Sequence, residues 1–119
     1  MIKIQKEDEY ILTSVENGKI KLTKLLLKYG ANINAIERNG DNALVTSSLK
    51  KDFRMMEFLI ANGIEIENRN QMGKTALIVC ARFGAFDSME KLIELGAKVN
   101  TEDNFGQTAG TFERFFKNI

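Results

Sequence analysis

The sequence predicts an all-α solenoid of stacked helix-turn-helix units, and three observations lead to this prediction. A short string recurs as GDNAL, GKTAL and GQTAG from Gly40, Gly73 and Gly106, so the interval is 33 residues both times (73 − 40 and 106 − 73). A second string, GANIN, GIEIE and GAKVN, keeps the same interval, and an apolar block (LLL, FLI, KLI) precedes each copy. Self-similarity at a fixed period of this length is the sequence signature of a repeat architecture.

The first helix of each unit should begin just after Asn42 or Thr75. A side-chain oxygen at that position can accept a hydrogen bond from a backbone N–H that has no partner inside the helix. We expect these helices to run to about Asn17, Lys50 and Phe83 in successive units.

The turn that follows requires a left-handed backbone, which Gly18 and Gly84 allow and which should strain Lys51 in the equivalent position. The second helix then shows apolar residues at spacings of three and four, which is typical of a helix with one buried face. The residues expected on that face are Ile20, Thr23, Leu26 and Leu27, then Phe53, Met56, Leu59 and Ile60, then Phe86, Met89, Leu92 and Ile93.

A glycine should end each second helix, and a polar arm with another glycine at its return turn should lead to the next unit. The helix-ending glycines are Gly30, Gly63 and Gly96, and those of the return turns are Gly40, Gly73 and Gly106.

Neither helix of a unit is long enough to be stable alone, so each must bury its apolar face on the neighbouring unit. A chain of 119 residues fits one domain. We therefore predict a single domain over residues 1–119, with repeats at approximately 5–37, 38–70 and 71–103 and a capping half repeat at 104–119.

This pattern resembles the ankyrin repeat family from about Lys6 to the C-terminus. The best copy runs from Gly73 to Asn100, where GKTAL matches the family opening G-x-T-x-L and LIELGAKVN matches the close L-[LI]-x-x-G-A-x-V-N. The resemblance implies an ankyrin-repeat solenoid with β-hairpin-like arms that binds proteins and has no catalytic activity. One departure is alanine in the proline position of the family motif, at Ala43, Ala76 and Ala109.

Bulk composition narrows the possible functions. The net charge of +1 gives no overall attraction to nucleic acid or to anionic membranes. Histidine is absent and Cys80 is the single cysteine, so a metal site built from His and Cys, a His-dependent triad and an intrachain disulfide are all excluded. One thiol suits a reducing compartment. We expect a cytoplasmic monomer with no cofactor, no bound nucleic acid and no membrane contact.

The tripeptide Gly73-Lys74-Thr75 raises the alternative of a nucleotide-binding enzyme. A phosphate-binding loop needs a second glycine five residues earlier, and Asn68 stands there. The recurrence of the string favours a structural role. Another alternative is nucleic-acid binding by a basic stripe made of Lys19, Lys21, Lys24 and Lys28. We favour the interpretation that this stripe is a solvated outer face of the second helix.

Two kinds of residue that could carry chemistry are expected to be buried instead. Cys80 aligns with serines in a small-residue position between helices, and free cysteine is commonly buried. Met55, Met56 and Met89 fall in the apolar pattern of the second helices. The carboxylate pairs of the chain, by contrast, are interpreted as solvated charge. No catalytic constellation emerges.

The family resemblance implies a concave binding surface made of the arms and the exposed side of the first helices. Carried over position by position, the arm residues are Ile36, Arg38, Asn39, Asp41, Arg69, Gln71, Met72, Lys74, Glu102, Asn104, Phe105 and Gln107, and the helix residues are Glu16, Asn17, Leu49, Lys50, Arg82 and Phe83.

This surface becomes aromatic toward the C-terminus, as the series Asn39, Met72, Phe105 shows. Aromatic residues, Met and Arg are enriched at protein interfaces. We expect Phe105 to be exposed and Phe116 to pack inward on the last helix; Phe83 and Phe105 could instead fold onto that helix. The predicted partner-binding set is Arg38, Asn39, Asp41, Lys50, Arg69, Met72, Lys74, Arg82, Phe83, Phe105 and Gln107, with Met72, Arg82, Phe83 and Phe105 as anchors.

Two functions within this class remain open. The first is a protein-protein interaction module that binds its partner through the concave surface. The second is a small inhibitor or immunity-type protein that blocks a partner enzyme or toxin.

Overall fold

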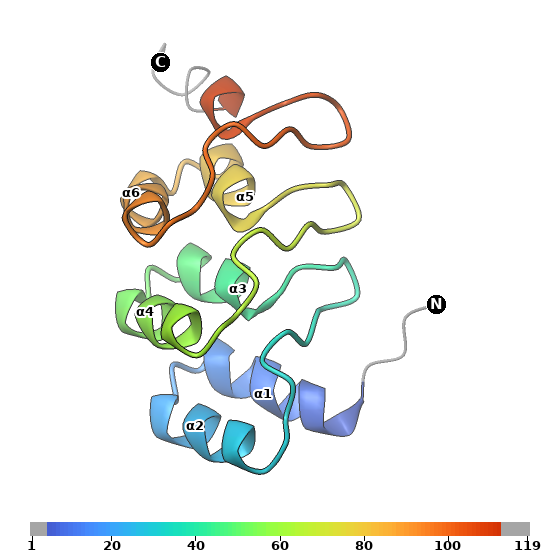
Figure 1. Ribbon diagram of the computed structural model, residues 1–119, viewed down its shortest axis with the longest axis vertical. Coiled ribbons are helices and arrows are strands. Elements are labelled where there is room, and N and C mark those ends of the chain that lie inside the picture. Colours follow the sequence, from blue (N-terminus) through green and yellow to red (C-terminus); the bar gives the residue numbers. More distant parts are fainter. Residues whose placement is uncertain (1–4, 113–119) are drawn as a thin grey trace.

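The computed structural model describes residues 5–112, and they form a stack of helix pairs (Figure 1). The predicted all-α repeat solenoid is confirmed. A further helix begins at Ala109 and is described to residue 112. The six complete helices are α1 (Lys6–Glu16), α2 (Ile20–Lys28), α3 (Ala43–Leu49), α4 (Phe53–Ala61), α5 (Ala76–Arg82) and α6 (Phe86–Glu94).

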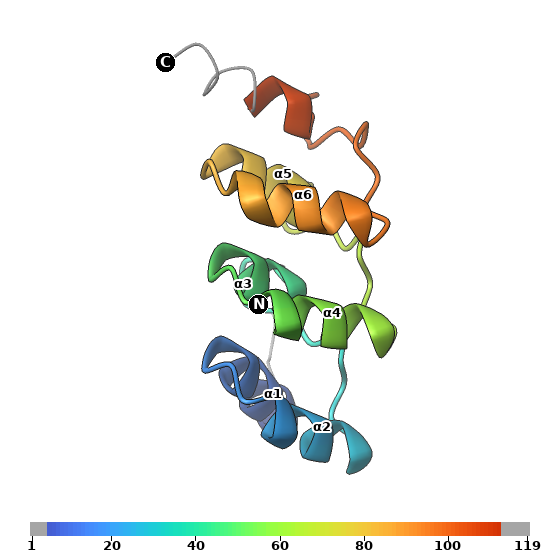
Figure 2. The same ribbon diagram turned by 90° about the vertical axis from the view of Figure 1, so that its left-hand side faces the viewer.

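The helices form two rows, with α1, α3 and α5 in one and α2, α4 and α6 in the other (Figure 2). The arms project beyond the first row, all on the same side of the stack (Figure 1). Each arm closes through an equivalent backbone hydrogen bond: Glu37 N–H donates to the Asp41 oxygen, and Asp103 N–H donates to the Gln107 oxygen, both at 2.8 Å. Over the described residues, hairpin pairing amounts to one antiparallel bridge, between Ile36 and Asn42.

The core lies between successive helix pairs. Met55, Met56 and Leu92 are fully buried there, and Cys80 is as well, as the sequence predicted. The expected second-helix face is wrong at three positions, since Phe53, Phe86 and Ile93 are 37%, 42% and 45% exposed.

These exposures follow from position in the stack. Phe53 and Phe86 are the first residues of their helices, where the chain emerges from the turn. Ile93 corresponds to Ile60, which is half-buried, but no second helix follows α6 within residues 5–112.

The two predicted N-caps behave differently. Thr75 Oγ1 accepts a hydrogen bond from Ile78 N–H at 3.4 Å, so its capping role is confirmed. Asn42 stands at the N-cap position with an extended backbone but makes no side-chain cap bond. Its Nδ2 instead donates to the carbonyl oxygen of Glu65 at 2.8 Å, and the amide therefore links two repeats.

The arms are held to one another along the stack. Gln71 N–H donates to the Asn39 oxygen at 2.9 Å, and one repeat later Asn104 N–H donates to the Met72 oxygen at 3.0 Å. Below the arms, Asn34 Oδ1 accepts from Glu65 N–H at 2.9 Å. The two bonds between arms are one repeat interval of 33 residues apart (104 − 71 and 72 − 39), and with the third they fix the position of each repeat relative to the next.

The strain predicted at Lys51 is confirmed. Its φ is 56°, whereas Gly18 and Gly84 have φ values of 68° and 70° in the equivalent turns. A side chain with a Cβ is disfavoured in this left-handed region.

Replacing Lys51 with glycine should therefore raise the free energy of unfolding by about 1 kcal/mol. The left-handed conformation costs a residue with a Cβ about 1–2 kcal/mol, and glycine loses part of that gain through its larger unfolded-state entropy. Urea unfolding measures the change, and Gly84→Ala, as the reverse control, should destabilise. An unchanged or lower stability of Lys51→Gly would show that the turn is not strained.

Candidate protein-interaction groove

The arms and the first-row helices enclose a hollow of about 370 Å³ on the concave side. Leu49, Val79, Arg82 and Phe83 reach it from α3, α5 and the turn after α5. The arms supply Asn39, Asp41, Asn70, Gln71, Met72 and Lys74. Several residues predicted for the partner-binding surface are thus brought together at one place. Val79 and Asn70 are additions that the sequence did not single out.

Two large apolar side chains that line this hollow, and a third on the next arm, are exposed to solvent. Phe83 is 64% exposed, Phe105 is 65% exposed and Met72 is 45% exposed. The alternative that Phe83 and Phe105 fold inward is therefore wrong, while Phe116 lies outside the described residues. The guanidinium carbon of Arg82 lies 5.7 Å from the centroid of the Phe83 ring, which allows a cation–π contact.

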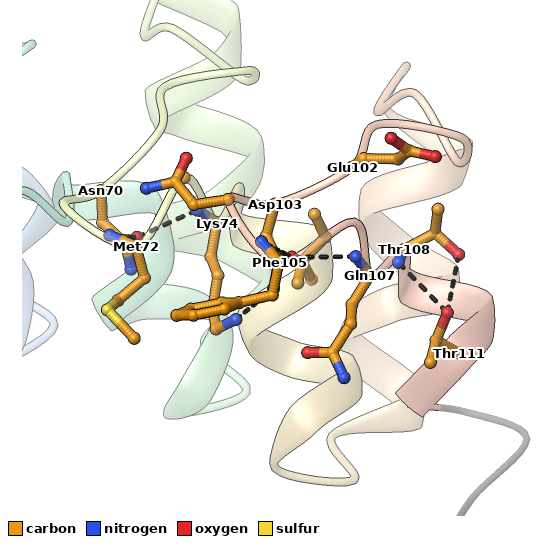
Figure 3. Close-up of polar contacts among 12 residues, drawn as sticks. Asn70, Met72, Lys74, Glu102, Asp103, Phe105, Gln107, Thr108 and Thr111 are labelled. Carbon is orange, nitrogen blue, oxygen red and sulfur yellow. Dashed lines mark hydrogen bonds and ion pairs between the residues drawn. The ribbon is translucent and has the colours of Figure 1, made fainter.

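Lys74 belongs to the predicted partner-binding set, but the structure buries it. Its side chain is buried, and its Nζ forms an ion pair with Asp103 Oδ2 (Figure 3). The ammonium lies 5.6 Å from the Phe105 ring centroid and 5.3 Å from that of Phe112. It is buried because the next arm folds over it and supplies a carboxylate and the Phe105 ring, while Phe112 comes from the helix that begins at Ala109.

The tripeptide that resembles a phosphate-binding loop has a structural role at each of its three residues. Gly73 makes the return turn with φ of 76°, and a Cβ there would contact the Asn104 side chain and lie 2.8 Å from its backbone nitrogen. Lys74 pairs with Asp103, and Thr75 caps α5. A nucleotide phosphate could reach the ammonium only if Lys74 left its carboxylate partner.

Asp103 organises the last arm in addition to pairing with Lys74. Its Oδ1 accepts hydrogen bonds from the N–H groups of Phe105 and Gln107, both at 2.9 Å. Burial acts to raise the pKa of Asp103, but Lys74 and these two N–H groups outweigh it and hold the pKa below its ordinary value. Asn70 makes the equivalent turn one repeat earlier without a charge.

Other predicted residues also bond within the protein. Arg69 is exposed, yet its guanidinium donates to the carbonyl oxygens of Gly73 at 3.0 Å and Glu102 at 2.7 Å. Asp41 accepts from Asn39 and from Asn70. The bonds from Arg69 to Glu102 and from Asn70 to Asp41 join adjacent arms, and the other two each lie within one arm. The remaining predicted residues are exposed (Arg38, Asn39, Lys50 and Arg82) or half-buried (Gln107).

The N-terminal end of the groove is acidic, which the sequence interpretation missed. Glu9, Glu16 and Glu37 line a second hollow of about 270 Å³, together with Leu12 and Thr13. Burial raises the pKa of Glu37, and the nearby charges of Glu16 and Asp41 raise it further. The signal was present in the repeat alignment, because Glu16 stands one period before Leu49 and two periods before Arg82.

The described residues offer little support for nucleophilic catalysis, metal binding or membrane spanning. Burial raises the pKa of the Cys80 thiol to about 12, so the thiolate nucleophile is absent at neutral pH. Within residues 5–112, no three His, Cys, Asp or Glu side chains are grouped to hold a metal ion. No helix in that range is long and apolar enough to cross a membrane.

The paired helices, aligned arms and single concave groove define a helical-repeat protein of the solenoid class. A family model described as "Ankyrin repeats (3 copies)" matches residues 11–103. The chain belongs to the ankyrin repeat family, whose repeats are generally protein-protein interaction modules. A comparison with curated protein sequences found no match.

The Asp103→Asn substitution should lower the free energy of unfolding by about 3 kcal/mol, because it leaves the Lys74 ammonium buried without a counter-ion. The amide oxygen can still accept from Phe105 and Gln107, as that of Asn70 does in the preceding arm. Adding Lys74→Met to this variant should recover most of the loss. Urea unfolding of the three proteins provides the test, and a stable single variant would rule out a structural role for the ion pair.

The same pair should make stability depend on pH. Because the pKa of Asp103 is lowered in the folded protein, its contribution is fully present above the ordinary aspartate pKa of about 3.9. It is lost as the pH falls through the folded value. The stability difference between wild type and Asp103→Asn should therefore be constant from pH 7 to about pH 5 and shrink at more acidic pH. A difference that grows on acidification would contradict this assignment.

Proposed function

We propose that this protein binds a partner protein through its concave groove and has no catalytic activity of its own. The observation that carries the proposal is the exposure of Met72 and Phe83 beside Arg82 in one hollow, with Phe105 exposed on the next arm. Interface hot spots are enriched in aromatic residues and arginine. Apolar side chains gathered on an exposed surface and rimmed by polar residues mark interaction sites.

The arms support this proposal because they are positioned before a partner arrives. Backbone bonds join the arms at Gln71 and Asn104, and the Gln71 side chain adds a bond from Nε2 to the Arg38 oxygen at 2.9 Å. A surface that is already ordered loses less conformational entropy on binding. The groove can therefore use its exposed side chains for affinity.

A protein suits this groove better than a nucleic acid does. Glu9, Glu16 and Glu37 lie at one end of it and would repel phosphate groups. The basic stripe starts at Lys19, the N-cap of α2, and continues along α2, which lies in the other helix row (Figures 1 and 2).

Affinity capture from the source cells, followed by quantitative mass spectrometry, tests the proposal with three variants. Phe83→Ala and Phe105→Ala should each remove bound partner, with losses of roughly 2 kcal/mol for a central anchor, or about thirtyfold in affinity. Tyr29→Ala is the matched control, because Tyr29 is 77% exposed but lies at the end of α2.

Thermal unfolding should confirm that all three variants remain folded. Capture that the groove variants leave intact, or that Tyr29→Ala reduces equally, would contradict binding through the groove.

A further inference from the structure

The charge of the groove changes sign along the stack. One position on the first helices, repeated at 33-residue intervals, is occupied by Glu16 on α1, Leu49 on α3 and Arg82 on α5. Glu16 lines the N-terminal hollow, whereas Leu49 and Arg82 line the larger one. A single row of equivalent positions thus runs from acidic through apolar to basic.

The acidic end is not neutralised inside the protein. Glu9, Glu16 and Glu37 share one hollow, and none of them has an ion pair with any described residue. Glu37 is half-buried, so part of its hydration is already lost. A basic side chain in this hollow would lie among carboxylates that have no ion pair with any described residue.

The basic end of the groove also lacks an ion-pair partner among the described residues. Arg82 has no carboxylate within ion-pair distance among the described residues, and it lies beside the exposed Phe83 ring. Lys50 is exposed at the end of α3, one repeat before Phe83. A carboxylate next to an apolar side chain would meet Arg82 while the apolar group contacts Phe83 and Met72.

The two ends belong to one continuous surface. Asp41 lines the larger hollow, and its backbone oxygen accepts a hydrogen bond of 2.8 Å from the N–H of Glu37, which lines the N-terminal hollow. Leu49 lies between the end marked by Glu16 and the end marked by Arg82, on the intervening helix α3. A bound segment that spans both hollows would therefore contact acidic, apolar and basic side chains in that order.

The geometry points to a partner segment with a basic side chain over Glu16 and Glu37, an apolar side chain over Leu49 and Met72, and a carboxylate against Arg82. This inference rests on the proposed function and adds the chemistry and direction of the partner. A reversed segment would place like charges together at both ends. Such repulsion selects orientation and partner more strongly than it adds affinity.

A random library of 16-residue peptides displayed on phage can test this with the full-length protein. One panning uses the wild type, and a parallel panning uses the charge-swap variant Glu16→Arg/Arg82→Glu, which keeps the net charge. Both positions are exposed, so the fold should tolerate the swap. Lys24→Glu/Glu90→Lys makes the same formal exchange on α2 and α6 and serves as the control.

We expect peptides selected on the wild type to carry a basic residue on one side of an apolar residue and an acidic residue on the other, in one order. They should bind the swap variant at least tenfold more weakly and the α2/α6 control equally well. Glu16→Gln and Arg82→Gln should each weaken binding about two- to fivefold, as expected for an exposed ion pair. Changing the peptide's basic residue to Glu should weaken binding to wild type, and Glu16→Arg should restore it.

Peptides that need Phe83 but show no charge order, or that bind the swap variant unchanged, would overturn this inference and leave the proposed function standing. Enriched peptides that are insensitive to both Phe83→Ala and the swap would overturn both. Failure to enrich any peptide whose binding depends on the groove would also count against both.

Discussion

The contact between neighbouring repeats is the interaction on which this structure depends. The six helices α1 to α6 contain 7 to 11 residues, and isolated helices shorter than about 12–15 residues are marginal in water. Burial of α3 and α5 on their neighbours is extensive: every residue from Ala76 to Ala81 is buried. Side chains add specific links in register, such as the bond from Asn42 to Glu65. The arms are aligned because the helices beneath them are stacked.

Stacking also separates the residues that stabilise the fold from those that can recognise a partner. Buried positions such as Met56 and Leu92 hold the repeats together. Exposed positions of the first helices contribute less to stability. Glu16, Leu49 and Arg82 can therefore differ in charge although the backbone conformation is the same in each repeat. The groove thus has a regular backbone but carries different side chains in each repeat. Those differences would determine selectivity for a partner.

Much of the fold could be predicted from the sequence because it depends on period and local chemistry. The 33-residue interval predicted the helix pairs, and the presence of Lys51 where the other repeats have glycine predicted the strained turn. Burial of Cys80 followed from its small-residue position. The surface at Met72, Phe83 and Phe105 was anticipated because equivalent residues of the repeats could be compared.

The rest depends on contacts between distant residues. Lys74 is a polar arm residue by its position, and its burial depends on Asp103, 29 residues later, and on two phenylalanine rings. Asn42 has the chemistry of a cap, yet its side chain is used to donate from Nδ2 to the carbonyl oxygen of Glu65 in the next repeat. The acidic hollow could not be predicted, because the spacing of Glu9, Glu16 and Glu37 in the sequence does not indicate that they lie together.

Native-state hydrogen exchange, resolved by residue, tests the central claim most directly. If stability comes from contacts between neighbouring repeats, the amides of α3 and α5, which have repeats on both sides, should exchange most slowly. Protection should decrease toward α1 and α2 at the N-terminal end of the stack. Slowest exchange in α1 or α2, with α3 opening more readily, would contradict the account.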